Sequence, residues 1–324
     1  MYRMIVRRLD GLDALEVEES DRPEVGAGEV GIEARAIGCN FFDTLITQGK
    51  YQIKPELPFS PGAEVSGVVY AVGEGVTEVA PGHRVNALLP YGAFASDVVA
   101  PADRVFPIPD AVSFEDAAAT GLVYQTSHLA LVHRANLQAG ETLLVHAAAG
   151  GVGLAAVQIG AALGARVIGT AGTPEKLSLI REHGADVALN YRDEDWVALV
   201  KEHTGGRGAD VVYDPVGGDT FDLSTKCIAF EGRILIVGFA SGRIPTAAMN
   251  RVMVKNFSLV GIHWGLYFDK NPAVLHASQR ALSELQAEAK IKPVVSRTFP
   301  LREAAAALAA LADRRTTGKI VLIP

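Results

Sequence analysis

The stretch from Thr142 to Ala165, TLLVHAAAGGVGLAAVQIGAALGA, constrains the fold more than any other part of the chain. It contains no Asp, Glu, Lys or Arg. Its first residues, 142–147, form an apolar run too short for a globular helix, and a helical period begins after the glycines at 150–153. We therefore expect a buried strand, a tight turn and a helix. A membrane span has a similar length, but five glycines and the strand–helix units that follow argue against it.

This turn predicts a phosphate cradle for a dinucleotide. Glycines let the backbone approach a pyrophosphate closely, and the free N–H groups of the following helix favour its negative charge. The pattern reads A-x-G-x-x-G, and an ordinary glycine-rich turn is the alternative because such a pattern alone is weak evidence. The residues expected to contact the cofactor here are Ala148, Gly150, Gly151, Val152 and Gly153.

Composition limits the class of protein. A chain of 324 residues, 49% hydrophobic and 21% charged, is long enough for about two domains and a large core. Its amino-terminal segment carries charges throughout and has no apolar stretch of signal-peptide length, so we expect a cytoplasmic protein. A net charge of −7 without a Lys/Arg block predicts neither a nucleic-acid partner nor a membrane partner. The two cysteines, Cys39 and Cys227, are too few for a disulfide framework or a four-cysteine zinc lobe.

The chain shows two kinds of periodicity. The first part, to about Phe114, is β-rich and predicts a small barrel or sandwich with strands at 30–36, 65–72, 84–89, 95–100 and 104–107. The next part alternates strands and helices and predicts an α/β fold with a doubly wound parallel sheet. Its expected strands are 142–147, 166–170, 187–190, 210–214, 233–237 and 258–262. One expected helix runs from Pro174 to His183, with Thr173 as its N-cap.

The carboxyl-terminal tail is expected to return to the first domain. It contains helical patterns at 272–289 and 301–315 and strand patterns at 293–299 and 319–323. We therefore predict a discontinuous β-rich domain at 1–120 and 266–324, and a Rossmann domain at 121–265.

The region after the second strand of the parallel sheet selects the dinucleotide. In NAD-binding units, an acid about 20 residues past the glycines holds the ribose hydroxyls, whereas residues 170–173 here read TAGT. An acid would repel a 2′-phosphate, so its absence predicts NADP. Thr173, Lys176, Tyr191 and Arg192 are the expected partners of the adenosine end. A solvated surface lysine is the alternative for Lys176, and Glu175 beside it weakens the assignment.

Several motifs together resemble the zinc-free, zeta-crystallin-like quinone oxidoreductases of the medium-chain dehydrogenase/reductase superfamily. They are GCNFFD at 38–43, PGAEVSG at 61–67, Tyr191-Arg192, VVYDPVGG at 211–218 and the closing TGKIVLIP. The resemblance covers essentially the whole length. It implies a GroES-like catalytic domain beside the Rossmann domain, NADPH as cofactor, and a reductase of quinones or small α,β-unsaturated carbonyls.

The same resemblance implies that no catalytic zinc is used. The zinc alcohol dehydrogenases of that superfamily have ligands at the positions of Asn40, a cysteine there, and Ala63, a histidine there. Hydride transfer to a quinone or enone needs less charge stabilisation than alcohol oxidation, because the acceptor delocalises the charge. The resemblance further implies that Asn40 and Tyr51 are the hydrogen-bond donors, with a turn residue and a rim aromatic as the respective alternatives. Gln48 departs from the arginine that relatives often carry.

Further positions follow from the resemblance and from the rule that ligands lie beyond the carboxyl ends of parallel strands. Thr126 and Lys319 match residues that relatives place near the cofactor; a buried helix hydroxyl and a strand-edge lysine are the alternatives. Phe239, His263 and Trp264 follow the last two strands and are expected to line the nicotinamide and substrate wall, with a packed imidazole as the alternative for His263.

Two other functions remain open from the residues alone. A 2-enoyl thioester (enoyl-CoA) reductase uses the same hydride chemistry, although no basic channel for such a substrate is identifiable. A catalytically inactive NADPH-sensing or RNA-binding module is the alternative of another class. In either case, the apolar edge strand near Ser258–Ile262 predicts a homodimer. The sequence leaves the physiological acceptor undetermined.

Overall fold

The chain divides into two compact units in the computed structural model, which describes residues 1–313 and 315–324. Unit 1 comprises Met1–Leu122 and Pro293–Pro324, and unit 2 comprises Val123–Lys292. The first boundary lies two residues from the expected one. The chain returns to unit 1 only at Pro293, so the expectation that residues 266–292 belong to the β-rich domain is wrong.

Residues 266–292 belong to unit 2 because they pack against its other helices. They form α8 (Leu266–Lys270) and α9 (Pro272–Ala287), and α9 buries Leu275 and Leu282. Ser278 Oγ lies 2.9 Å from His128 Nδ1, and Gln125 Nε2 donates to Gln279 Oε1 at 2.7 Å. The helical period predicted the helix itself, but it could not specify which unit the helix packs against.

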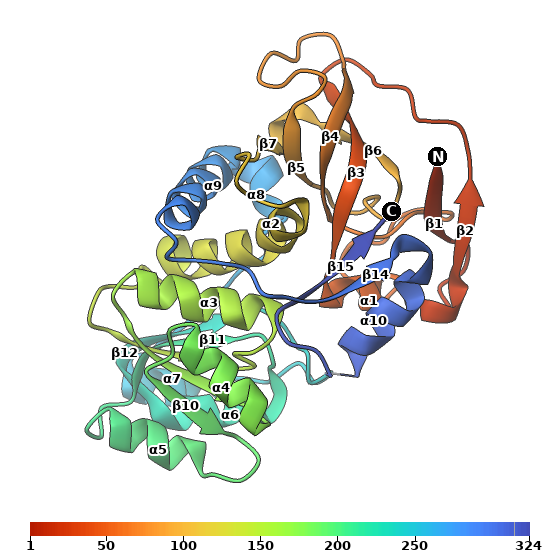
Figure 1. Ribbon diagram of the computed structural model, residues 1–324. Helices are drawn as coiled ribbons and strands as arrows, with labels where there is room; N and C mark the ends of the chain where they lie inside the picture. The colour runs from red at the N-terminus through yellow and green to blue at the C-terminus, as the bar shows by residue number, and fades with distance from the viewer. Residues whose placement is uncertain (314) are drawn as a thin grey trace. The chain divides into compact units, whose positions relative to one another are not determined.

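Unit 1 is β-rich, as predicted. Its described residues form a two-stranded sheet of β1 (Tyr2–Val6) and β2 (Leu15–Glu19), and a seven-stranded sheet ordered β14-β15-β3-β4-β5-β7 with β6 on β3. The strands of the larger sheet are β3 (Glu29–Cys39), β4 (Glu64–Val72), β5 (Arg84–Leu88), β6 (Asp97–Pro101), β7 (Val105–Pro107), β14 (Val295–Pro300) and β15 (Lys319–Ile323). Figure 1 shows β3, β4 and β5 side by side. β14 pairs parallel with β15, and the other pairings are antiparallel.

Among the described residues of this unit, two α-helices complete the fold and a third begins. α1 (Phe41–Ile46) follows β3 directly, and α10 (Ala304–Ala312) connects β14 to β15 after a short 3₁₀ turn. The expected helix 301–315 is thus shorter, and its residue 314 lies outside the described residues. α2 (Phe114–His128) starts in unit 1 and continues into unit 2, where a π-helical turn (Leu129–Arg134) extends it.

Unit 2 is a doubly wound α/β sheet, as predicted. Its described strands are all parallel, in the order β10-β9-β8-β11-β12-β13. They are β8 (Thr142–Val145), β9 (Arg166–Ala171), β10 (Val187–Asn190), β11 (Ala209–Asp214), β12 (Ile228–Ile236) and β13 (Ser258–Gly261). The expected edge position of β13 is confirmed. No helix of the described chain is long and apolar enough to cross a bilayer.

Helices connect these strands. They are α3 (Gly151–Ala162), α4 (Pro174–Glu182), α5 (Trp196–His203), α6 (Gly218–Cys227) and α7 (Met249–Lys255). In α4 the Thr173 hydroxyl accepts from the Lys176 N–H and Pro174 occupies the first turn, so the predicted N-cap is confirmed. This order of strands, with the crossover helices, is that of a dinucleotide-binding fold.

One side chain of α3 forms hydrogen bonds close to the two points where the chain enters and leaves unit 2. Gln158 is buried, and its Oε1 accepts from the Tyr124 hydroxyl at 3.0 Å and from the Lys292 N–H at 2.7 Å. Its Nε2 donates to the Lys292 carbonyl at 2.8 Å. Tyr124 is the second residue of the unit and Lys292 is its last. A single amide therefore holds the entry and the exit of unit 2 against α3.

The end of β8 carries a buried imidazole. His146 Nδ1 lies 3.1 Å from Thr170 Oγ1 and Nε2 lies 2.9 Å from Ser224 Oγ, while the ring meets Trp196 edge-on. Burial lowers the pKa of His146 to about 3, because a charged ring would lose its hydration without gaining a counter-ion. The ring is therefore neutral at pH 7.

Replacing His146 by leucine is expected to remove one component of the pH dependence of stability. The pKa of His146 rises from about 3 in the folded chain to the ordinary 6.5 on unfolding, so the unfolded chain takes up the proton first as the pH falls. The stabilisation is complete above pH 6.5 and is lost toward pH 3. The difference in unfolding free energy between wild type and His146→Leu should fall by about 1.4 kcal/mol per pH unit below pH 6.

Urea denaturation at a series of pH values measures this difference. His133→Leu, which removes an exposed imidazole from the same unit, is the matched control and should keep the wild-type pH dependence. A His146→Leu difference that stays constant from pH 7 to pH 4 contradicts a neutral buried imidazole.

Candidate functional site

The turn after β8 forms a cradle at the N-terminus of α3. Gly150 is the N-cap of this helix, and no side chain caps its first turn. The Ala148 N–H donates to the Thr170 carbonyl at 3.0 Å, which ties the turn to β9. The N–H groups of Gly151, Val152 and Gly153 therefore begin a twelve-residue helix without an internal capping partner. Such an end of a helix binds a phosphate.

Steric limits explain the glycine spacing. A Cβ on Gly153 would overlap the Ala147 carbonyl oxygen and lie 2.8 Å from Ala148 Cα, so only glycine fits. A Cβ on Gly150 would meet the Ala147 oxygen at 3.3 Å, which is tight but not prohibitive. Ala148 replaces the usual first glycine because the opposing strand has Gly169, where a Cβ would lie 3.1 Å from the Ala148 methyl. Gly169 in the neighbouring strand β9 thus leaves the space that the methyl group of Ala148 needs.

Two side chains approach the backbone at the end of β9. A Cβ on Gly172 would lie 2.7 Å from Tyr191 Oη and 3.0 Å from Arg192 Nε. The Arg192 guanidinium lies 6.0 Å from the centre of the Tyr191 ring, and 46% of Tyr191 is exposed. An aromatic face and a guanidinium thus flank the place where the adenosine end of a dinucleotide lies in this fold.

Lys176 adds a second cation to this place. Its pKa is lowered, first by partial burial and then by the nearby charge of Arg192. Two cations brought close together repel each other, and a bound dianion removes this repulsion. Residues 170–173 contain no acid, as the sequence shows, although Glu175 lies exposed in the first turn of α4.

The turns that follow β11 and β12 also lie at the carboxyl edge of the parallel sheet. The buried Asp214 carboxylate accepts from the N–H groups of Val216 and Gly217 at 2.8 and 2.9 Å. Burial raises its pKa, while these two bonds favour the charged form. Phe239 follows β12 and lies over this turn, since a Cβ on Gly217 would be 2.9 Å from its ring. Phe239 is therefore placed at the carboxyl edge of the sheet.

The second half of α2 is joined to the cradle through a residue that the sequence did not indicate. Ser127 Oγ donates to the Val152 carbonyl at 3.0 Å and lies 2.9 Å from the buried Tyr213 hydroxyl. Thr126, the expected cofactor contact, is half-buried beside it. A single sequence does not show which residues a serine within a helix will contact.

The segment after β13 carries two of the residues expected at the substrate wall, Trp264 and His263. Trp264 donates its indole N–H to Gln125 Oε1 at 3.0 Å, and its ring packs edge-on against Phe268. The indole N–H of Trp264 is therefore used inside unit 2. His263 is half-buried, and its Nδ1 has no hydrogen-bond partner among the described residues.

In unit 1, the expected catalytic asparagine begins α1. Asn40 is 5% exposed and is the N-cap of this helix, with Asp43 as the third residue of a capping box. The Asn40 N–H donates to Asp43 Oδ2 at 2.7 Å, and the Gly62 N–H donates to Asp43 Oδ1 at 3.2 Å. Burial raises the pKa of Asp43 to about 7. Asp43 therefore caps the start of α1.

Tyr51 and Gln48 follow the same helix. The Tyr51 ring lies 5.0 Å from the Phe42 ring and packs against the small cluster of Val6, Ile46 and Phe59. Burial and, to a smaller extent, the Asp43 charge raise the pKa of Tyr51, so its hydroxyl keeps its proton at neutral pH. The Gln48 amide donates to the Thr44 carbonyl at 2.9 Å and accepts from Lys50 at 2.8 Å.

Lys319 lies elsewhere than expected. Its ammonium donates to three oxygens of unit 1, namely Cys39 O at 2.7 Å, Asn40 Oδ1 at 2.7 Å and Glu64 Oε1 at 2.6 Å. Only 4% of the side chain is exposed. All three N–H groups are used, so the expected contact of Lys319 with a cofactor phosphate does not fit this geometry. Glu64, its counter-ion, was not identified from sequence, although a lone acid in the apolar run AEVSGVV requires a partner.

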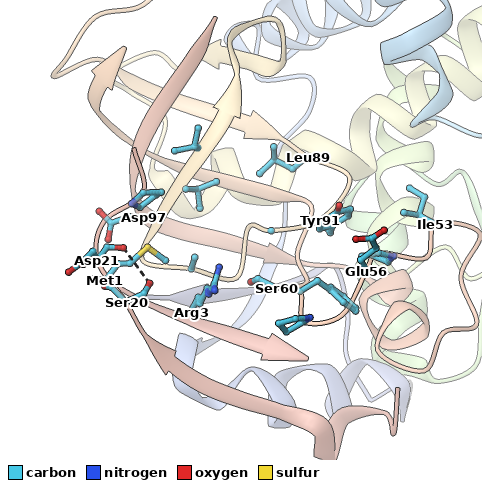
Figure 2. Close-up of a pocket in the computed structure, with 18 of the residues that line it drawn as sticks. Met1, Arg3, Ser20, Asp21, Ile53, Glu56, Ser60, Leu89, Tyr91 and Asp97 are labelled. Carbon is cyan, nitrogen blue, oxygen red and sulfur yellow. Dashed lines mark hydrogen bonds between the residues drawn. The ribbon is translucent and has the colours of Figure 1, made fainter. Parts of the chain in front are cut away.

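A separate cavity of about 780 Å³ lies in unit 1 (Figure 2). It runs from Met1, Arg3 and Ser20 to Glu56 and Tyr91. None of the expected site residues lines it. Across the described chain there is also no cluster of three or more His, Cys, Asp or Glu side chains that could hold a metal ion.

Comparison with known proteins identifies both units. Residues 26–110 match the alcohol dehydrogenase GroES-like domain, and residues 151–280 match the zinc-binding dehydrogenase family. The chain is 40% identical to a quinone oxidoreductase-like protein 2 homolog of Nematostella vectensis, over 99% of this chain and 88% of the relative. It is 40% identical to a quinone oxidoreductase of Pseudomonas aeruginosa, over 97% of each. The Escherichia coli quinone oxidoreductase, solved with NADPH, superposes with a TM-score of 0.94 at 35% identity and full coverage of both chains.

Proposed function

Since the chain belongs to the quinone oxidoreductase family of the medium-chain dehydrogenase/reductase superfamily, we propose that it is an NADPH-dependent reductase of quinones or small α,β-unsaturated carbonyls. The observation that carries this proposal is the uncapped, glycine-lined N-terminus of α3, with Lys176, Tyr191 and Arg192 beyond the neighbouring strand. Bound NADPH supplies a hydride from its nicotinamide ring.

The cradle and the two cations divide the recognition of NADPH between them. The first-turn N–H groups of α3 take the pyrophosphate, and glycine at 150 and 153 lets the turn close tightly against the Ala147 carbonyl. Lys176 and Arg192 take the 2′-phosphate, whose charge relieves their mutual repulsion. Tyr191 stacks on the adenine, and Thr173 lies beside the phosphate at the start of α4. Thr126 and Phe239 contact the nicotinamide half.

Residues of unit 1 act on the acceptor. Hydride addition leaves negative charge on the acceptor oxygen, and a hydrogen-bond donor lowers the energy of that state. Tyr51 serves as this donor through its phenolic hydroxyl, which carries a proton at neutral pH. Asn40 is the second donor, and Gln48 contributes to the acceptor pocket.

The other functions have less support. A 2-enoyl thioester reductase needs a long channel with basic residues at its mouth, and no set of basic residues for such a channel is identifiable in the sequence. A sensor or RNA-binding module needs no side chains that donate hydrogen bonds to an acceptor oxygen, whereas this chain has both Asn40 and Tyr51. We therefore favour the quinone or enone reductase.

Single substitutions of Lys176 or Arg192 by alanine are expected to weaken NADPH binding at least tenfold and to change NADH binding less than twofold. Each removes a charge-assisted hydrogen bond worth about 1.5–3 kcal/mol to the 2′-phosphate, which NADH lacks. Fluorescence titration with both nucleotides measures the two dissociation constants. Lys201→Ala, which removes an exposed lysine of α5, should leave both unchanged. Equal weakening of NADH and NADPH would show that these cations do not read the 2′-phosphate.

Replacing Tyr51 by phenylalanine is expected to lower kcat about a hundredfold without changing the NADPH dissociation constant, because only the donor to the acceptor oxygen is lost. The packing of the ring on Phe42 remains, so the unfolding midpoint should stay near that of wild type. Loss of 340 nm absorbance with 1,4-benzoquinone and with an enone measures kcat. Tight NADPH binding by wild type with neither acceptor reduced would favour the thioester reductase or the sensor.

The edge strand β13 supports a homodimer. It pairs only with β12 within the described sheet, and α7, which ends three residues before β13, exposes 71% of Met253 and 73% of Val254. Apolar side chains beside an open strand edge favour pairing with a second copy. We expect the wild type to sediment as a dimer and Val254→Glu to shift it toward the monomer, whereas Val17→Glu, at an exposed valine of unit 1, should not. A monomeric wild type would overturn this assignment.

A further inference from the structure

Asn40 is held at both ends of its amide by a buried ion pair. Its Oδ1 accepts from Lys319 Nζ at 2.7 Å, and its Nδ2 donates to Glu64 Oε1 at 2.9 Å. The same Glu64 oxygen accepts from Lys319 at 2.6 Å, so the three side chains form a closed triangle. Turning the amide over would place its N–H groups against the ammonium and its oxygen against the carboxylate. One orientation of Asn40 is therefore strongly favoured.

The backbone of unit 1 leaves space for this ion pair. Glu64 is fully buried, and its other oxygen accepts from the Leu122 N–H at 2.8 Å. A Cβ on Gly38 would overlap Glu64 Oε1, and one on Gly121 would lie 3.0 Å from Oε2. β15 brings Lys319 to this place, because Ile320 pairs with Cys39 at the end of β3. A buried charge pair is rarely a good source of stability, so another role must explain why the fold accommodates it.

The fixed orientation leaves one N–H of Asn40 available. The first hydrogen of Nδ2 is taken by Glu64, and the nearest acceptor for the second is the Gly38 carbonyl at 3.5 Å, the limit for a hydrogen bond. The second hydrogen can therefore bond to a stronger acceptor, such as a developing oxyanion.

We infer that Lys319 and Glu64 are positioning residues that orient the Asn40 amide, so that its second N–H donates to the acceptor oxygen during reduction. This inference rests on the proposed reductase function. It replaces the expected role of Lys319 at a cofactor phosphate, and the two roles make different predictions for NADPH affinity.

The test uses a neutral replacement of the pair in the full-length protein. Lys319→Met alone would leave the Glu64 carboxylate buried without its counter-ion and should lower the unfolding midpoint strongly. The double variant Lys319→Met/Glu64→Gln has no unpaired buried charge, so its unfolding midpoint should return toward that of wild type. We expect this double variant to bind NADPH within twofold of wild type. Its kcat with benzoquinone should be about one tenth of the wild-type value or lower. A rise in the NADPH dissociation constant of tenfold or more would instead support the phosphate contact.

A mutant cycle shows whether the pair acts through Asn40. Asn40→Ala should lower kcat by about a hundredfold. If the pair only orients Asn40, adding Lys319→Met/Glu64→Gln to Asn40→Ala should change kcat less than twofold further. Losses that multiply in the combined variant would overturn the inference, and so would an Asn40→Ala variant with wild-type kcat. Failure of the reductase function itself is distinguishable, because wild type would then bind NADPH without reducing the acceptor.

Discussion

The parallel pairing of the strands in unit 2 is the constraint on which its nucleotide site depends. Parallel strands need crossover connections, and these bring the carboxyl end of every strand to the same edge of the sheet. The glycine turn after β8, Gly172 after β9 and Phe239 after β12 therefore gather at one edge although they are far apart in the chain. Because the strand order reverses between β8 and β11, the cradle lies at the point where this fold leaves a crevice.

Local patterns carried much of this information in the sequence. Glycine spacing, strand length and the cap at Thr173 are set by residues close together in the chain, so the elements of unit 2 and the position of the cradle could be predicted. The partners of buried polar groups could not. Glu64 and Lys319 are 255 residues apart, and Trp264 and Gln125 are 139 apart. A single sequence shows that such groups need partners, but the partner is chosen by the packing of the whole fold.

The same limit explains the misplaced domain boundary. The pattern of α9 shows that one face is buried, and either unit could have covered it. Contacts of Ser278 and Gln279 with α2 decide the matter, and these are polar contacts between ordinary helical residues. Gln158 adds to this, because its amide bonds to Lys292 just before the chain leaves unit 2. The boundary thus follows from hydrogen bonds that carry no local signature.

The position of β15 in the chain affects how the protein folds during synthesis. β15 occupies the sheet between β14 and β3, yet the ribosome makes it after all of unit 2. At about 5–20 residues per second, the 197 residues from Leu122 to Lys319 take roughly 10–40 s. During that time the end of β3 has an unpaired edge and Glu64 has no counter-ion. Unit 2 can therefore fold first. Until β15 is synthesised, the amino-terminal part of unit 1 keeps an exposed strand edge, to which chaperones or other unfolded chains can bind.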